Sequence, residues 1–138
     1  MAIKRTLGSL VLGAVGLGVA SCQTMTLGQP GSCNTHECHL KVTVNDCNIT
    51  VDPEPITITA RNVELHWDIV SSGYTFTASG IVINQDPQNE FSGGHLAERD
   101  TKFILNDKNS FPRTYKYTVN VKRGSTTCAP LDPSIANN

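Results

Sequence analysis

The chain has 138 residues, of which 38% are hydrophobic and 17% are charged. This length is enough for one modest domain and not comfortably for two. The formal net charge is −1 at pH 7, and no run of basic residues forms the positive stripe that nucleic-acid binding needs. We therefore expect a single domain with no nucleic-acid partner.

Residues 1–21 differ in character from the rest of the chain. Lys4 and Arg5 give a positive start, and the run from residue 7 to residue 20 carries no charge. This is the pattern of a secretory signal peptide. A membrane-spanning helix needs about 20 apolar residues, whereas this run is shorter and is interrupted by four glycines. The segment therefore predicts export and cleavage.

The leader ends in Val19-Ala20-Ser21-Cys22, which resembles the lipobox of bacterial lipoproteins. The resemblance implies that Cys22 carries the lipid, that the signal peptide is cut just before it, and that the chain is anchored to a membrane of the cell envelope. Gln23 follows in place of the aspartate that retains family members at the inner membrane, which favours the outer membrane, facing the periplasm. The alternative is an ordinary secretory signal in which Cys22 is incidental.

Cysteine parity supports a special role for Cys22. Removing it from the five cysteines leaves Cys33, Cys38, Cys47 and Cys128, an even set in an oxidising compartment. Four cysteines allow three pairings. We favour Cys33 with Cys38 and Cys47 with Cys128, because the second pair would close a long loop and stabilise a small core.

The mature chain is expected to consist of an anchor and flexible tether over 22–37 and a folded domain over 38–138. Apolar and polar residues alternate with a period of two in seven short segments, which predicts half-buried strands: 42–44, 56–59, 63–69, 74–77, 81–83, 102–105 and 114–121. No convincing helical period appears. The pattern predicts an all-β fold, a single antiparallel β-sandwich. Through "ELHWDI" and "YKYTVNV" it resembles small immunoglobulin-like and cupredoxin-like sandwiches in architecture.

One segment, "CNTHECH", is rich in metal ligands. Cys33, His36, Cys38 and His39 offer thiolates and imidazoles, which zinc and copper(I) prefer. The spacing matches no zinc finger, and disulfide formation by the two cysteines is the favoured interpretation. A cupredoxin-type copper site is disfavoured because neither histidine nor methionine follows Cys128. We expect no cofactor.

Three further positions bear on catalysis. Trp67 is predicted to be a core residue, and His66, which alternates with it, is expected on a solvated face together with Glu64 and Asp68. His95 and Glu98 are placed in a glycine-flanked loop and could act as acid and base in a small hydrolase.

These observations predict a lipid-anchored periplasmic binding module and not an enzyme. Its partner would be an envelope protein or component, and an inhibitor or immunity role would fit such a module. A metal-handling lipoprotein using residues 33–39 is the first alternative, and a small hydrolase is the second.

Overall fold

The computed structural model describes residues 28–138, so the leader and Cys22 lie outside the described residues. Residues 28–138 form eleven strands and no helix. This part of the chain therefore contains no helix that could span a membrane. The strands are β1 (Gly31–Cys33), β2 (Glu37–Asn45), β3 (Asn48–Asp52), β4 (Ile56–Ile58), β5 (Val63–Ile69), β6 (Thr75–Ile83), β7 (Phe91–Ala97), β8 (Lys102–Asp107), β9 (Arg113–Arg123), β10 (Thr126–Thr127) and β11 (Ser134–Asn137).

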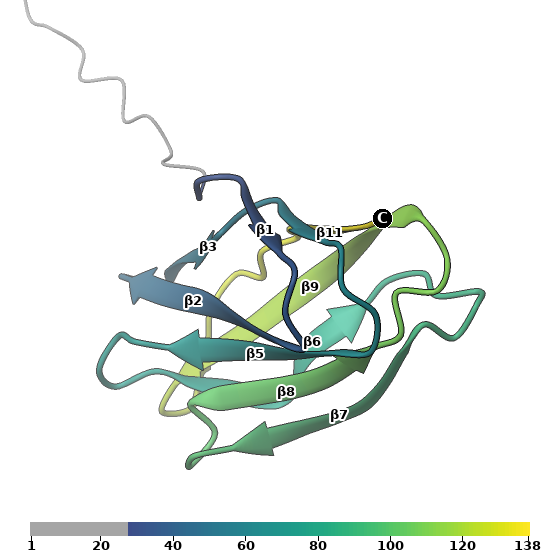
Figure 1. Ribbon diagram of the computed structural model, residues 1–138. Coiled ribbons are helices and arrows are strands. Elements are labelled where there is room, and N and C mark those ends of the chain that lie inside the picture. Colours follow the sequence, from purple (N-terminus) through teal and green to yellow (C-terminus); the bar gives the residue numbers. More distant parts are fainter. Residues whose placement is uncertain (1–27) are drawn as a thin grey trace, which may run out of the picture.

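The strands form two packed sheets, which confirms the predicted all-β sandwich (Figure 1). One sheet has the order β3-β2-β5-β8-β7. The other has the order β1-β4-β11-β9-β10, with β6 on β9 as well. Both sheets are mixed rather than purely antiparallel, because β2 pairs with β5, β1 with β4 and β11 with β4 in parallel.

The sandwich begins before the predicted boundary at residue 38. Within the segment expected to be a flexible tether, Gly31–Cys33 forms β1 and pairs with Ile56–Ile58 of β4. A side chain at Gly31 would collide with Pro53, so the chain passes too close to its neighbour for any residue but glycine. The tether prediction is therefore wrong for residues 31–33.

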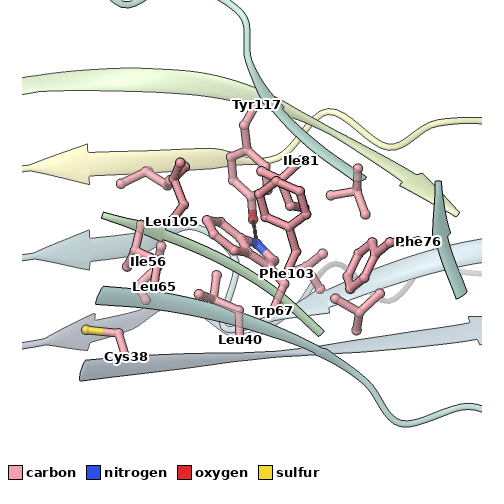
Figure 2. Close-up of a cluster of buried hydrophobic side chains, with 14 of the residues drawn as sticks. Cys38, Leu40, Ile56, Leu65, Trp67, Phe76, Ile81, Phe103, Leu105 and Tyr117 are labelled. Carbon is pink, nitrogen blue, oxygen red and sulfur yellow. Dashed lines mark hydrogen bonds between the residues drawn. The ribbon is translucent and has the colours of Figure 1, made fainter. Parts of the chain in front are cut away.

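The core lies between the sheets and is centred on Trp67 of β5 and Tyr117 of β9 (Figure 2). Both side chains are fully buried, and their rings meet edge to face with centroids 5.4 Å apart. Trp67 Nε1 donates a hydrogen bond to the Tyr117 hydroxyl at 3.3 Å. Trp67 is therefore the core residue that strand alternation predicts.

Both predicted disulfides are confirmed. Cys33–Cys38 joins residues five apart at the corner between β1 and β2. Cys47–Cys128 joins residues 81 apart and ties the β2–β3 turn to the segment after β10. The two bonds use all four cysteines of the described chain.

Irregular pairing marks the strands β6 and β7, which border the two sheets. The β6–β9 register shifts between Phe76 and Ile81, and the β7–β8 register shifts between Ser92 and His95. Such bulges twist a sheet edge and discourage pairing with another chain. Recognition by simple strand addition is therefore disfavoured at these edges.

The hydrogen bond from Trp67 to Tyr117 joins the two sheets. We therefore expect replacement of Tyr117 and of Tyr115, both buried, to affect stability differently. Tyr117→Phe leaves Trp67 Nε1 buried without an acceptor, which should lower the free energy of unfolding by about 1–3 kcal/mol. Tyr115 is equally buried, but its hydroxyl has no hydrogen-bond partner among the described residues. Tyr115→Phe is the matched control and should be neutral or stabilising. Urea denaturation of both variants measures the difference, and equal losses would contradict this account.

Loop length predicts unequal contributions from the disulfides. In the chain-entropy model, replacing Cys47 and Cys128 by alanine should cost about 4–5 kcal/mol, and replacing Cys33 and Cys38 about 2 kcal/mol. Urea denaturation without reductant measures both double variants. A larger loss from the Cys33–Cys38 pair would contradict the entropic explanation.

Candidate functional site

The parallel register of β2 and β5 places two copies of a Glu-x-His pattern side by side. Glu37 pairs with Glu64, and His39 pairs with His66. Because residues two apart on a strand share a face, all four side chains lie on the outer face of the five-stranded sheet. We call these four residues the histidine–carboxylate cluster. The repeated pattern at 37–39 and 64–66 is a signal that sequence reasoning missed.

The polar atoms of this cluster converge. His39 Nε2 lies 2.9 Å from Glu37 Oε1, and His66 Nε2 lies 2.6 Å from Glu64 Oε1. His66 Nε2 is also 3.8 Å from Glu37 Oε1, and the two imidazole rings lie 4.7 Å apart. One nitrogen or oxygen atom from each of Glu37, His39 and His66 lies within 4.8 Å of the other two, close enough to hold a metal ion.

A carboxylate behind His39 holds its ring in place. His39 Nδ1 lies 2.9 Å from Asp68 Oδ2, and Asp68 is paired in turn with Lys102 at 3.2 Å. The hydrogen bond to Asp68 raises the pKa of His39; burial opposes this effect, and Glu37 adds to it. Burial would raise the pKa of Asp68, but the hydrogen bonds from His39 and Lys102 outweigh it and lower that pKa. Asp68 therefore stays ionised and orients His39.

His66 departs from the prediction of a solvated face. It points away from Trp67 as expected, yet only 7% of its surface is exposed. His39 on one side and Ile104 on the other are its neighbours in the sheet, and they exclude water from its ring. Its Nδ1 atom is buried and has no hydrogen-bond partner in the described part of the chain. Burial of a polar ring on an outer face is costly, so this position merits a functional explanation.

The metal site considered in "CNTHECH" as the alternative to a disulfide is not formed. Cys33 and Cys38 are joined in a disulfide, so neither sulfur is available as a thiolate. Cys38 faces the core while His39 is exposed, because adjacent residues of a strand point to opposite faces. His36 Nδ1 instead lies 3.1 Å from the carbonyl oxygen of Arg61. Of the four predicted ligands, only His39 belongs to the histidine–carboxylate cluster.

The acid–base pair of His95 and Glu98, on which the hydrolase alternative depends, is not assembled either. His95 lies on β7 and not in a loop, and its Nδ1 donates to the carbonyl oxygen of Gly93 at 2.8 Å. Glu98 forms an ion pair with Lys102 at 2.9 Å. Within residues 28–138 no hydrogen bond or ion pair joins His95 to Glu98.

A second titratable cluster, elsewhere in the sandwich, is buried. Glu90 accepts hydrogen bonds from the backbone N–H and the hydroxyl of Ser110, both at 2.6 Å, and from the Phe111 N–H at 3.1 Å. Burial would raise the pKa of Glu90, but these hydrogen bonds outweigh it and lower the pKa. Glu90 is therefore a buried carboxylate that fastens the loop after β8.

The pKa of Asp107, at the end of β8, is shifted in the opposite direction from that of Glu90. Its Oδ1 accepts hydrogen bonds from the Asn109 N–H at 2.9 Å and from Asn137 Nδ2 at 3.0 Å. Its Oδ2 is buried and has no partner among the described residues. Burial, reinforced by the negative charges of Glu90 and Asp86, raises the pKa of Asp107 to about 6. This group titrates near neutrality but joins a structural network rather than an open site.

Comparison with known proteins finds neither a matching family model nor a matching curated protein.

The raised pKa of Asp107 predicts how stability depends on pH. Its folded-state value of about 6 exceeds its ordinary value of 3.8, so the folded protein binds more protons than the unfolded chain between these values. The stabilisation is complete below about pH 4 and is lost as the pH rises through about 6. Asp107→Asn keeps an oxygen atom that can accept the hydrogen bonds from Asn109 and Asn137, and it removes the ionisable group. Relative to wild type, it should gain about 3 kcal/mol in unfolding free energy between pH 4 and pH 7.5.

Urea denaturation of wild type and Asp107→Asn across this pH range measures that relative gain. Other carboxylates titrate in both proteins, so their effects cancel in the comparison. A difference that does not change with pH would contradict the assignment.

Proposed function

We propose that the protein is a lipid-anchored, non-catalytic binding module of the bacterial cell envelope. The observation that carries the proposal is the use of cysteines. The four cysteines after Cys22 pair with one another in two disulfides, which suits an oxidising compartment. This pairing leaves the lipobox-like cysteine as the one assigned to lipid.

The position of the described N-terminus supports display of the sandwich at a membrane surface. Gly28 lies against Val51 of β3, and β3 and β7 are opposite borders of the five-stranded sheet (Figure 1). Gly28 is six positions after Cys22, and a chain of that length can reach at most about 20 Å. A lipid on Cys22 would thus hold β3 near the outer membrane and leave β7 on the periplasmic side, farther from the lipid.

Side chains on the outer face of the five-stranded sheet suit recognition better than the bulged edges at β6 and β7 do. The bulges in β6 and β7 disfavour strand addition. The outer face offers charged and polar groups on three adjacent strands, among them Lys41 of β2, Asp68 of β5 and Lys102 of β8. An envelope protein with complementary charges is the partner that this face fits, as in an inhibitor or immunity protein.

The contacts of the histidines support a non-catalytic role. His39 and His66 bond to carboxylates, whereas nucleophilic catalysis needs a base beside a hydroxyl or thiol. His95 bonds to a backbone carbonyl. These arrangements favour binding over hydrolysis.

Lipid attachment predicts both the location and the mass of the protein. The full-length gene product expressed in a Gram-negative host should partition with the membranes and begin at Cys22. Its intact mass without reductant should exceed the mature chain by the acyl groups and fall short by four hydrogens for two disulfides. Cys22→Ser is the matched control and should lack the acyl groups. An unlipidated wild-type chain, or a Cys22→Ser variant that still carries lipid, would refute the anchor.

A further inference from the structure

We propose that Glu37, His39, Glu64 and His66 form a binding site for a divalent transition-metal ion of the zinc class. This inference goes beyond partner binding and does not depend on the lipid anchor. It uses a different set of residues from the site predicted in "CNTHECH", with only His39 in common.

The donor set and its spacing fit such an ion. Zinc accepts imidazole nitrogen and carboxylate oxygen at about 2.0–2.2 Å, usually in a tetrahedron, so neighbouring ligand atoms lie about 3.4 Å apart. Glu37 Oε1 lies 2.9 Å from His39 Nε2 and 3.8 Å from His66 Nε2, which brackets that separation. Small rotations of the exposed Glu37 and half-buried Glu64 side chains would complete four ligands.

The ring of His39 is oriented for binding through Nε2. Its Nδ1 lies 2.9 Å from Asp68 Oδ2, and its Nε2 lies 2.9 Å from Glu37 Oε1. When the single N–H of a neutral imidazole is on Nδ1, it donates to Asp68 and the lone pair of Nε2 faces Glu37. An ion placed there could be bound by both Nε2 and Oε1.

The shell around the cluster has the organisation that metal sites use. Metal-bound histidines commonly donate their second ring N–H to a carboxylate, which fixes the tautomer and the ring. Asp68 stands in that position behind His39, and Lys102 holds Asp68 from the other side at 3.2 Å. His39 thus has its outer carboxylate in place.

His66 is the second imidazole ligand, and the sheet fixes the direction of its ring. Its side chain is 9% exposed and lies between His39 and Ile104 of the neighbouring strands, with Nε2 directed into the cluster. That atom faces the oxygens of Glu64 and Glu37 at 2.6 and 3.8 Å. Both histidines also project from paired strands inside the sheet, which holds their geometry more firmly than a loop would.

Zinc titration of the full chain tests the site. The protein, purified in detergent without a histidine tag or reductant, is first treated with chelator and dialysed. Calorimetric titration with ZnCl₂ at pH 7.5 in a non-coordinating buffer should show one saturable site per chain, with a dissociation constant in the micromolar range or tighter. MgCl₂ should show no such binding, because Mg²⁺ prefers oxygen ligands.

The four histidines of the chain provide matched variants. His39→Asn and His66→Asn should each weaken zinc binding by about 100-fold or more, and Asp68→Asn by about 10- to 100-fold. His36→Asn and His95→Asn, which alter histidines outside the cluster, should bind zinc as wild type does. Circular dichroism without zinc checks the fold of each variant, and the exposed Glu37→Gln is used if His66→Asn does not fold.

Nitrogen chemical shifts of the histidine side chains give a direct readout. Zinc should move the Nε2 signals of His39 and His66 and leave those of His36 and His95 in place. The absence of saturable binding overturns the proposal and leaves a proton shared between His39 and the carboxylates. Binding that survives His39→Asn or Glu37→Gln in a folded protein also overturns it. None of these outcomes alters the mass or membrane partition that tests the lipid anchor.

Discussion

The parallel pairing of β2 with β5 is the constraint on which the rest of the structure depends. This register sets Leu40 beside Trp67 on the inner face and His39 beside His66 on the outer face. Because side chains alternate with a period of two, a slip of one residue would turn the core outward and disperse the histidine–carboxylate cluster. A single register therefore serves both the packing of the sandwich and the geometry of the candidate site.

Strand periodicity predicts the parts of this fold in which large side chains alternate. It locates β2, β5 and β9, the burial of Trp67 and the all-β class. It does not find β7, because Gly93 and Gly94 interrupt the alternation. A Cβ atom at Gly94 would lie 3.2 Å from the ring of Phe103, which is a tight contact. The three-residue β1 and four-residue β11 are too short to show a pattern. β1 depends on pairing with β4, and β11 depends on pairing with both β4 and β9.

The candidate site shows a different limit of sequence reasoning. Periodicity indicates the face to which a side chain points, but not which strand lies next to its own. Adjacency in sequence groups His39 with Cys38, whereas the pleat of the strand directs the two side chains to opposite faces. Its true neighbour, His66, is 27 positions away and is reached only through the parallel pairing. The disulfides were predictable because parity and compartment limit the pairings to three.

The long disulfide also determines how the chain responds to force. Tension applied to the two ends of the chain reaches Cys47 and Cys128, and the covalent bond between them then carries the load past the 81-residue interval that they enclose. Residues outside that interval, including β1, β2 and β11, can be peeled away, while β5 and β9 with the Trp67–Tyr117 contact are shielded. The half of the histidine–carboxylate cluster on β2 lies outside the shielded interval and the half on β5 lies inside it. Mechanical extension would therefore separate the two histidines while most of the sandwich stays closed.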